Sequence, residues 1–577
     1  MNLKDFFAGQ AFDACDYFGA HPDVEGYAFR TYAPNARGVG IIGDFNGWQE
    51  QPMKPLYDSG IWVAYVREAR PGQIYKYCVY GADGRREHCD PYGFGMELRP
   101  GSGSVVRDLG EYRFTDEAWL SARTRGISGP VNIYELHLGS WQRNGHDAGS
   151  YCGIADPLIS YLKTHGYNYV EFMPLSEHPF DGSWGYQNTG FFAPTSRYGS
   201  AAQLMALIDR LHHAGIGVIM DFVPVHFAVD DYGLARYDGT ALYEYPDRED
   251  GESEWGSYNF NHARGEVASF LMSAADYWLT RYHVDGLRMD AVSRLIYRHG
   301  DESRGENGPA IAFLRRMNRG LRARHPSAML IAEDSTAYPG VTKTVEDGGL
   351  GFDYKWDLGW MHDTLRYMGL PPRQRPDHPR LITFSMYYAY NERYILPFSH
   401  DEVVHEKRTI IDKLYGDYDE KFAQLRLLYF YMFTHPGKKL NFMGNEIAMF
   451  REWDERRTPD WNLLEYPAHR DFHGFMAALC DIYLAESALW ERDHVPEGVQ
   501  WIDRLSDNAG VFGFFRVSGR GRLLVLLNFT DVPAELCAPL PGRCKLLLST
   551  CGCCGALATD SLPEALPPFT GLLYRVE

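Results

Sequence analysis

The chain has 577 residues, with 57 Lys and Arg against 76 Asp and Glu, which gives a formal net charge of −19 at pH 7. At roughly 150 residues per domain, this length predicts a multi-domain protein. The hydrophobic share of 45% and the charged share of 23% are those of an ordinary globular protein and exclude the disordered and fibrous classes. The negative charge argues against nucleic acid and anionic membrane surfaces as partners.

The first residues contain no apolar run that would serve as a secretory signal, because Asp5, Asp13 and Asp16 interrupt it. The longest apolar stretches, 427–433 and 523–527, are far shorter than the roughly 20 residues that cross a bilayer. We therefore expect a cytoplasmic protein with no membrane-spanning segment.

Residues 25–115 alternate apolar and polar side chains, and turn residues such as Gly, Pro and Asn-Gly separate the alternating runs. This pattern is typical of short antiparallel strands joined by tight turns. It predicts an N-terminal β-sandwich over residues 1–115.

From Val131 the pattern changes to short apolar strands, each followed by a helical stretch, as in repeated βα units. The series predicts a (β/α)8 barrel over residues 116–485, with functional side chains at the carboxyl ends of its strands. Helices between strands are predicted over 202–213 and 266–282. The predicted strands are 132–137, 169–174, 217–223, 284–290, 328–333, 352–356, 395–399 and 439–443.

After about residue 490, strand patterns rich in apolar residues return, as in 511–517 and 522–529. They predict a C-terminal β-sandwich domain over residues 486–577. The predicted fold is a multi-domain α/β protein in which a central (β/α)8 barrel lies between two β domains.

Ionisable residues occur where predicted barrel strands end. The third strand is followed by Asp221 and His226, which could simply hydrogen-bond to loop backbone. The fourth places Arg288 and Asp290 on one face, since side chains alternate along a strand. A guanidinium beside Asp290 lowers its pKa, as a carboxylate nucleophile requires. Capping of the next helix by Asp290 is the alternative, but it leaves Arg288 unexplained.

The fifth and seventh strands also end in acids. Glu333 and Asp334 follow the fifth strand, and His400 and Asp401 follow the seventh. Partial burial beside Asp290 would raise the pKa of Glu333, as a general acid needs. The alternative is that Glu333 or Asp334 begins a loop as a solvated charge.

Metal-binding motifs are a competing interpretation of these segments. His400 and His405 are five residues apart, which is not the spacing of the zinc-protease helix. His400 to Glu402 resembles the start of a zinc deaminase site, but no Pro precedes Cys551 in the cysteine cluster at 551–554. That cluster also lacks a second Cys or His pair for zinc. We predict ordinary thiols, no metal and no cofactor.

Three carboxylates and a guanidinium occur at the strand ends of one predicted barrel. Separate structural roles, such as capping or loop hydrogen bonds, do not explain the whole set. Glycoside transfer requires such a set, because one carboxylate attacks the anomeric carbon while an acid protonates the leaving oxygen, and a covalent glycosyl-enzyme forms. The sequence therefore predicts this chemistry at the carboxyl end of the barrel.

Four of these segments resemble the signature regions of the alpha-amylase superfamily: 221–226, 286–290, 331–334 and 398–401. Further stretches are similar to the bacterial glycogen branching enzymes within that superfamily: 134–141, 179–187, 193–199, 355–361, 399–405, 442–446 and 451–453. The N-terminal β domain, which contains Trp48, is similar to the starch-binding module that precedes such barrels. An exposed Trp48 would suit glucan, although tryptophan is more often buried in a core.

The resemblance implies a role for each matching residue. Asp290 would be the nucleophile, Glu333 the general acid/base and Asp401 the third acid, which stabilises the distorted sugar. Arg288 would hold Asp290. The donor sugar would be bound through its hydroxyls by Asp221, His226 and His400 and by stacking on Tyr186.

Two positions depart from the family pattern. Val225 stands where a small residue is common, and Glu406 stands where Gly is common. Loop shape and the handling of the acceptor are the properties that these residues would change, and no catalytic group is lost.

The resemblance implies a retaining glycosyltransferase that cuts an α-1,4 link and transfers the chain to a glucan 6-hydroxyl. Its donor and acceptor would both be α-1,4-glucan, such as glycogen or amylose. One alternative is an α-glucan hydrolase of the same architecture, either trehalose-releasing or debranching. The other is a catalytically silent glucan-binding protein, against which the presence of all three acids argues. Transfer further requires acceptor sites that hold a sugar hydroxyl better than water.

Overall fold

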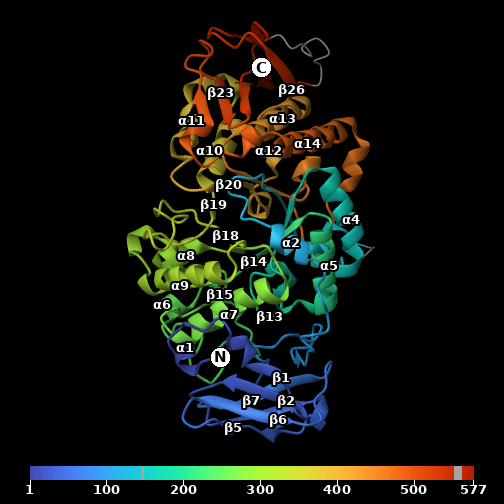
Figure 1. The fold of residues 1–577 in the computed structure, drawn as a ribbon, viewed down its shortest axis with the longest axis vertical. Helices are drawn as coiled ribbons and strands as arrows, with labels where there is room; N and C mark the ends of the chain where they lie inside the picture. The colour runs from blue at the N-terminus through green and yellow to red at the C-terminus, as the bar shows by residue number, and fades with distance from the viewer. Residues whose placement is uncertain (144–148, 552–561) are drawn as a thin grey trace.

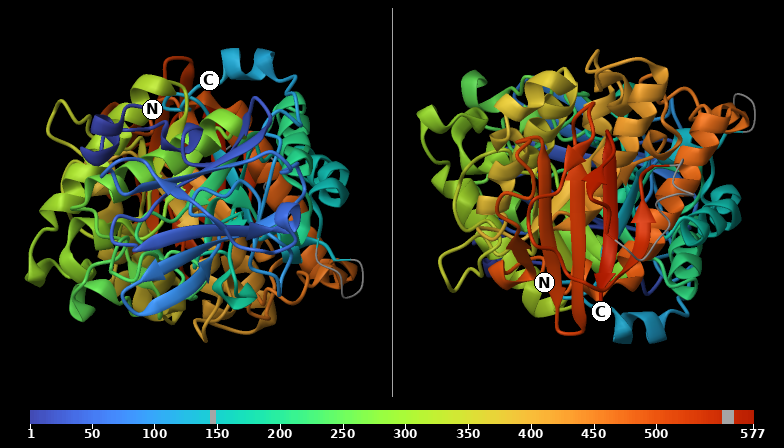
Figure 2. Two further views of the ribbon diagram at one scale, coloured as in Figure 1. Left: turned by 90° about the horizontal axis from the view of Figure 1, so that it is seen from below. Right: turned by 90° about the horizontal axis from the view of Figure 1, so that it is seen from above.

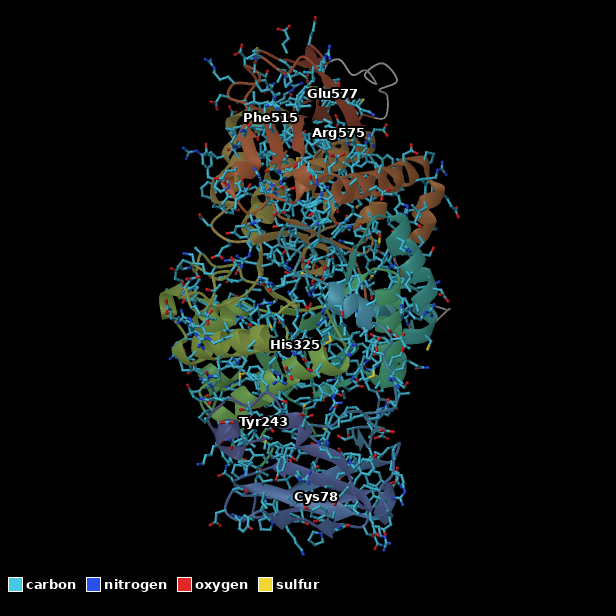
Figure 3. The ribbon with its side chains drawn as sticks, viewed as in Figure 1. Cys78, Tyr243, His325, Phe515, Arg575 and Glu577 are labelled. Atoms are coloured by element: carbon cyan, nitrogen blue, oxygen red, sulfur yellow. The ribbon has the colours of Figure 1, made fainter. Side chains whose placement is uncertain are left out.

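The structure is a computed structural model that describes residues 1–143, 149–551 and 562–577. Along its longest axis, N-terminal strands occupy one end, a barrel the middle and a C-terminal sheet the other end (Figure 1). Figure 3 shows Cys78 and Phe515 toward these opposite ends. The predicted fold class, a barrel between two β domains, is confirmed.

The N-terminal region consists of two antiparallel sheets, ordered β1-β2-β6-β5 and β4-β3-β7-β8, with β9 paired to β7. Alternation places Tyr75 and Tyr77 in the core, where both hydroxyls donate to the buried Asp90. The helix α1 (Leu3–Phe7) precedes the sheets. The strands are β1 (Gly19–Asp23), β2 (Gly26–Tyr32), β3 (Gly38–Gly43), β4 (Gln51–Pro52), β5 (Lys54–Pro55), β6 (Ile61–Val66), β7 (Ile74–Gly81), β8 (Gly84–His88) and β9 (Ser104–Val105).

The central region is a closed barrel in which β21 pairs with β10. All eight predicted strands are present and parallel, and their ends lie within two residues of the predicted ends. In barrel order the strands are β10 (Asn132–Leu136), β11 (Tyr169–Phe172), β14 (Gly217–Phe222), β17 (Gly286–Met289), β18 (Met329–Ala332), β19 (Tyr354–Trp356), β20 (Tyr394–Phe398) and β21 (Lys438–Phe442).

Helices between the strands surround the barrel, and their ends follow from local sequence. Ser200 and Gln203 form a capping box at the start of α5, which begins one residue before its predicted start. The two predicted helices are confirmed as α5 and α7. The longer helices are α4 (Tyr151–Thr164), α5 (Ala201–His213), α7 (Gly265–Arg281), α9 (Gly308–Arg324), α10 (Leu358–Gly369), α11 (Arg380–Tyr388), α13 (Tyr418–Thr434) and α14 (Pro467–Ala485).

The C-terminal region is built on a five-stranded sheet ordered β22-β23-β24-β28-β26, whose strands lie side by side when viewed from that end (Figure 2). A short pair, β25 with β27, lies beside it. The strands are β22 (Val499–Trp501), β23 (Val511–Ser518), β24 (Gly521–Asn528), β25 (Ala534–Glu535), β26 (Cys544–Ser549), β27 (Ala565–Leu566) and β28 (Thr570–Val576).

This sheet packs on α13, which explains why that helix is buried on nearly every side. Helix α13 is covered by the barrel and by the sheet, and a side chain at Gly571 would clash with the ring of Phe430. The buried Arg516 of β23 donates to the backbone carbonyls of Thr434 at 2.7 Å and Leu489 at 3.0 Å. The C-terminal sheet is thereby fixed to the barrel.

Two predictions concern segments away from the barrel. Cys553 and Cys554 of the predicted thiol cluster lie outside the described residues, so only Cys551 is placed. Across residues 1–143, 149–551 and 562–577, no helix is long and apolar enough to span a bilayer.

Candidate active site

A cavity of about 460 Å³ opens at the carboxyl ends of the barrel strands. All the predicted site residues line it except Asp221, which is buried beside Arg288 and Tyr186. The predicted set lines the cavity as Tyr186, His226, Arg288, Asp290, Glu333, His400 and Asp401. Tyr186 and His400, which are 214 residues apart in sequence, therefore meet at this end of the barrel, as its topology requires.

Arg288 is the centre of the site. Alternation along β17 points its side chain into the barrel, where it is 1% exposed. Its guanidinium contacts Asp221 at 2.6 Å, Asp290 at 2.9 Å and Glu333 at 2.7 Å. The guanidinium also lies 4.4 Å from the ring centre of Trp356, a cation–π contact. The single positive charge of Arg288 therefore contacts carboxylates at the ends of three different strands.

The charge state of Asp290 depends on two opposing effects. Burial raises its pKa to about 6, and the neighbouring Arg288 opposes that rise. The expectation of a lowered pKa is therefore wrong in its net direction, because burial outweighs the guanidinium. Helix α8 (Val292–Ile296) has Ala291 at its N-cap position and no side-chain cap, so Asp290 does not cap this helix. The carboxylate of Asp290 faces the cavity.

Glu333 follows β18 and is the least acidic of the three catalytic candidates. Burial and the charge of Asp290 raise its pKa to about 7, against the opposing effect of Arg288. The backbone N–H of Ala291 donates to Glu333 Oε2 at 2.8 Å and fixes the carboxyl group. The predicted rise is confirmed in direction and cause. Near neutral pH, Glu333 can hold a proton while Asp290 is ionised.

Asp401 is the most exposed of the three acids, with 54% of its side chain accessible. Burial opposes its ionisation, but His400 and Lys407 outweigh burial and lower its pKa. Lys407 Nζ lies 2.9 Å from Asp401 Oδ2. Asp401 is therefore a charged carboxylate at the mouth of the cavity.

His400 is fixed by a glutamate on β10, which β21 separates from β20. Glu135 of β10 accepts the backbone N–H of His400 at 2.9 Å and also contacts its Nδ1. Burial disfavours the imidazolium, but Glu135 outweighs burial and raises the pKa of His400. The ring of Tyr186 stacks on His400 with centroids 5.5 Å apart, and its hydroxyl donates to Asp221 at 2.6 Å.

His226 differs from His400 in the direction of its pKa shift. It is 3% exposed, and burial lowers its pKa to about 4, so the imidazole is neutral at pH 7. Its ring lies 5.0 Å from that of Trp255, another residue of the cavity wall. A neutral imidazole can both donate to and accept from sugar hydroxyls.

Sequence reasoning missed several residues that shape the site. Glu135 and Trp356 fall within stretches that resemble the branching enzymes, yet they received no role. Lys407, Trp184 and Trp255 come from loops, and only the folded chain brings them to the cavity. Strand-end positions could have revealed Glu135 and Trp356, and Trp184 lies in the similar stretch 179–187, whereas no local pattern singles out Lys407 or Trp255.

The two departures from the family pattern have clear positions. Val225 is 3% exposed and lines a second cavity next to the catalytic one. Glu406 has φ +64°, in the left-handed region that favours glycine. The backbone N–H groups of Glu406 and Arg408 both donate to the carboxylate of Glu452, which stabilises this turn.

Comparisons with known proteins agree with this architecture. Residues 17–93 match carbohydrate-binding module 48 (isoamylase N-terminal domain), and residues 139–237 match the alpha amylase catalytic domain. The chain is 46% identical to a 1,4-alpha-glucan branching enzyme GlgB of Desulfitobacterium hafniense, over 91% of this chain and 86% of the relative. It is 42% identical to that of Bacillus caldolyticus, over 99% of this chain and 89% of the relative.

Solved structures share the fold at low sequence identity. A pullulanase from Anoxybacillus sp. LM18-11 superposes with a TM-score of 0.79 at 18% identity, covering 100% of this chain and 87% of that chain. A putative alpha amylase from Salmonella typhimurium gives a TM-score of 0.75 at 18% identity, covering 97% and 100%. At such identity the likeness concerns the fold alone.

Proposed function

Because this chain belongs to the family of 1,4-alpha-glucan branching enzymes GlgB, we propose that it cleaves an α-1,4 link in one glucan chain and joins the released segment to a 6-hydroxyl of another. It is a glycosyltransferase that works by a retaining, glycosidase-type mechanism. The roles of the individual side chains below are our proposal.

The donor sugar is held from the barrel floor and from one wall. His400 and the neutral His226 bind its hydroxyls, and Tyr186, which the buried Asp221 holds in place, packs against its ring. Hydrogen bonds with Asp221 and stacking on His400 keep Tyr186 in place before substrate arrives. Such preorganisation reduces the free-energy cost of orienting the sugar.

In the first step, a carboxylate oxygen of Asp290 attacks the anomeric carbon. The bond from that carbon to O4 of the leaving chain breaks, and Glu333 gives its proton to O4. A pKa near 7 makes Glu333 a suitable proton donor at neutral pH. Asp401 stabilises the positive charge that develops on the ring, since its own pKa is lowered.

In the second step, the ionised Glu333 removes the proton from the 6-hydroxyl of an acceptor glucan. The oxygen attacks the anomeric carbon, and the carboxylate of Asp290 leaves. Two inversions at one carbon retain the α configuration. Arg288 supports both steps because it contacts Asp290 and Glu333 throughout.

The observation that carries this proposal is the contact of one buried arginine with three carboxylates, of which Asp290 and Glu333 have pKa values that burial raises to about 6 and about 7. The test is incubation of the purified protein with amylose, followed by proton NMR of α-1,6 links and an assay of reducing ends. New α-1,6 links with nearly constant reducing ends are expected. Rising reducing ends without new branches would instead identify a hydrolase.

A further inference from the structure

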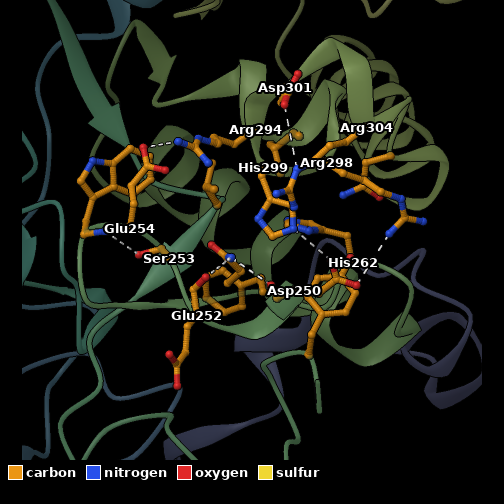
Figure 4. A pocket seen from close by; sticks show the side chains of 17 residues that line it. Asp250, Glu252, Ser253, Glu254, His262, Arg294, Arg298, His299, Asp301 and Arg304 are labelled. Atoms are coloured by element: carbon orange, nitrogen blue, oxygen red, sulfur yellow. Dashed lines mark hydrogen bonds and ion pairs between the residues drawn. The ribbon is translucent and has the colours of Figure 1, made fainter. Parts of the chain in front are cut away.

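A second cavity, of about 350 Å³, adjoins the catalytic cavity. Trp255 lines both cavities and therefore forms the wall between them. The remaining walls come from the segment after β14 and from the residues around α8 (Figure 4). Val225, one of the two departures from the family pattern, belongs to this second lining.

The charged side chains that line the second cavity each have an ion-pair partner. In Figure 4, Arg298 and His299 lie close to Asp250. The ion pairs are Arg294 with Glu254, Arg298 and His299 with Asp250, and Arg304 with Glu249. No net positive charge is therefore available to attract a phosphate, and the polar walls do not suit an apolar ligand. Hydrogen-bond donors and acceptors without an excess of positive charge suit a neutral polyhydroxylated chain.

Trp255 provides the flat surface that such a chain needs. Its side chain is 44% exposed, and the guanidinium of Arg294 lies 5.0 Å from its ring centre. Its backbone carbonyl accepts a hydrogen bond from Gln187 Nε2 at 2.8 Å. An indole held in this way presents a π-face to the C–H groups of a sugar ring at little cost in side-chain entropy.

The second cavity lies on the side of the proton donor. Glu333 accepts the N–H of Ala291, and Ala291 leads directly into α8, whose Arg294 and Leu295 line the second cavity. We therefore expect the glucan chain whose oxygen exchanges a proton with Glu333 to extend toward this cavity. The donor sugar instead lies against Tyr186 and His400.

We propose that the second cavity binds glucosyl units of the acceptor glucan, with Trp255 as the platform that guides the chain toward Glu333. This inference rests on the branching function proposed above and identifies the residues that hold the acceptor. Occupancy of this site places a 6-hydroxyl next to the glycosyl-enzyme and lets it outcompete water.

The test compares the ratio of α-1,6 links formed to reducing ends released from amylose. Trp255→Ala should lower this ratio by about fivefold to tenfold, the effect of losing one aromatic platform. The conservative variant Trp255→Phe should keep most of the wild-type ratio. Trp501→Ala is the matched control, because Trp501 is 38% exposed and lies in the C-terminal sheet. An unchanged ratio in a folded Trp255→Ala protein overturns the proposal.

Arg298→Ala probes the opposite wall without touching Trp255. The Arg298 side chain is 48% exposed, so its loss should not impair folding, and the ratio should fall severalfold. If the wild-type protein forms no branches, the site is tested by maltoheptaose binding. The binding is measured on the Asp290→Asn protein with and without Trp255→Ala. Weaker binding with Trp255→Ala then supports a glucan site although the branching function has failed, and equal binding overturns it.

Discussion

The two adjoining cavities use similar residues in opposite ways. In the catalytic cavity, Arg288 is shared by Asp221, Asp290 and Glu333, so three acids compete for one cation. In the second cavity, Arg294 and Arg304 each have their own carboxylate partner. In the catalytic cavity burial raises the pKa values of the acids and the shared Arg288 opposes that rise, which leaves Glu333 as a proton donor beside Asp290. In the second cavity the ion pairs leave a polar surface without an excess of positive charge. Reaction and binding are thus divided between neighbouring sites.

The largest expected effect comes from removing an acid of the shared set. Glu333→Gln should lower kcat for branching by about 10²- to 10⁴-fold, because it removes general acid–base catalysis. Asp290→Asn should lower it at least as much, since no covalent intermediate can form. The measurement is α-1,6 link formation by proton NMR on folded proteins. The comparison is Asp250→Asn, which changes an ion-paired acid of the second cavity and should lower kcat far less.

A loss with Asp250→Asn as large as that with Glu333→Gln would remove the distinction between the cavities. Normal activity in either purified catalytic variant would contradict the assigned roles. Circular dichroism should give native-like spectra for all three proteins, because the two amide substitutions in the catalytic cavity preserve side-chain shape.

The pH dependence tests the shared cation directly. Activity requires Asp290 ionised and Glu333 protonated, so kcat/KM should fall below about pH 6 and above about pH 7. These limits belong to the coupled pair rather than to each residue alone. Arg288→Lys keeps the charge but cannot contact all three acids at once, so both pKa values should rise and the profile should shift to higher pH.

Arg288→Lys should also reduce maximal activity by about tenfold to 100-fold, the effect of losing one or two charge-assisted hydrogen bonds. An unshifted profile would show that burial alone sets the pKa values. Arg304→Lys serves as the control from the second cavity and should leave the profile in place, because its partner Glu249 is exposed and does not line the catalytic cavity.

The sequence predicted the barrel more fully than it predicted the charge states. Short apolar strands and the helices between them are local patterns, so all eight strands and both stated helices were found. The acids were identifiable because they follow these strands. The direction of the pKa shift was predicted for Glu333 but not for Asp290, since the burial of Asp290 depends on residues from across the barrel. The limits 1–115, 116–485 and 486–577 remain a prediction.

The loops show the same distinction at individual residues. Trp255 and Lys407 lie outside the barrel strands, and their sequence neighbours give no sign of where the loops fold back. Val225 was noted as a departure near the acceptor, and it lies in the wall of the second cavity. A family pattern can therefore show that a residue is unusual at its position. What that residue contacts depends on segments that are far apart in the chain.

The smallest expected effect concerns Trp48 in the N-terminal domain. It is 44% exposed, the same fraction as Trp255, so the interpretation of Trp48 as a buried core residue is wrong. Its Nε1 donates to Asp44 at 3.1 Å, which fixes the ring at the surface. Trp48→Ala should weaken glycogen affinity about threefold to tenfold while leaving the ratio of branches to reducing ends unchanged. Equilibrium binding to glycogen measures the first quantity. A changed ratio would mean that the N-terminal domain takes part in acceptor placement, and unchanged affinity would leave Trp48 without a role in glucan binding.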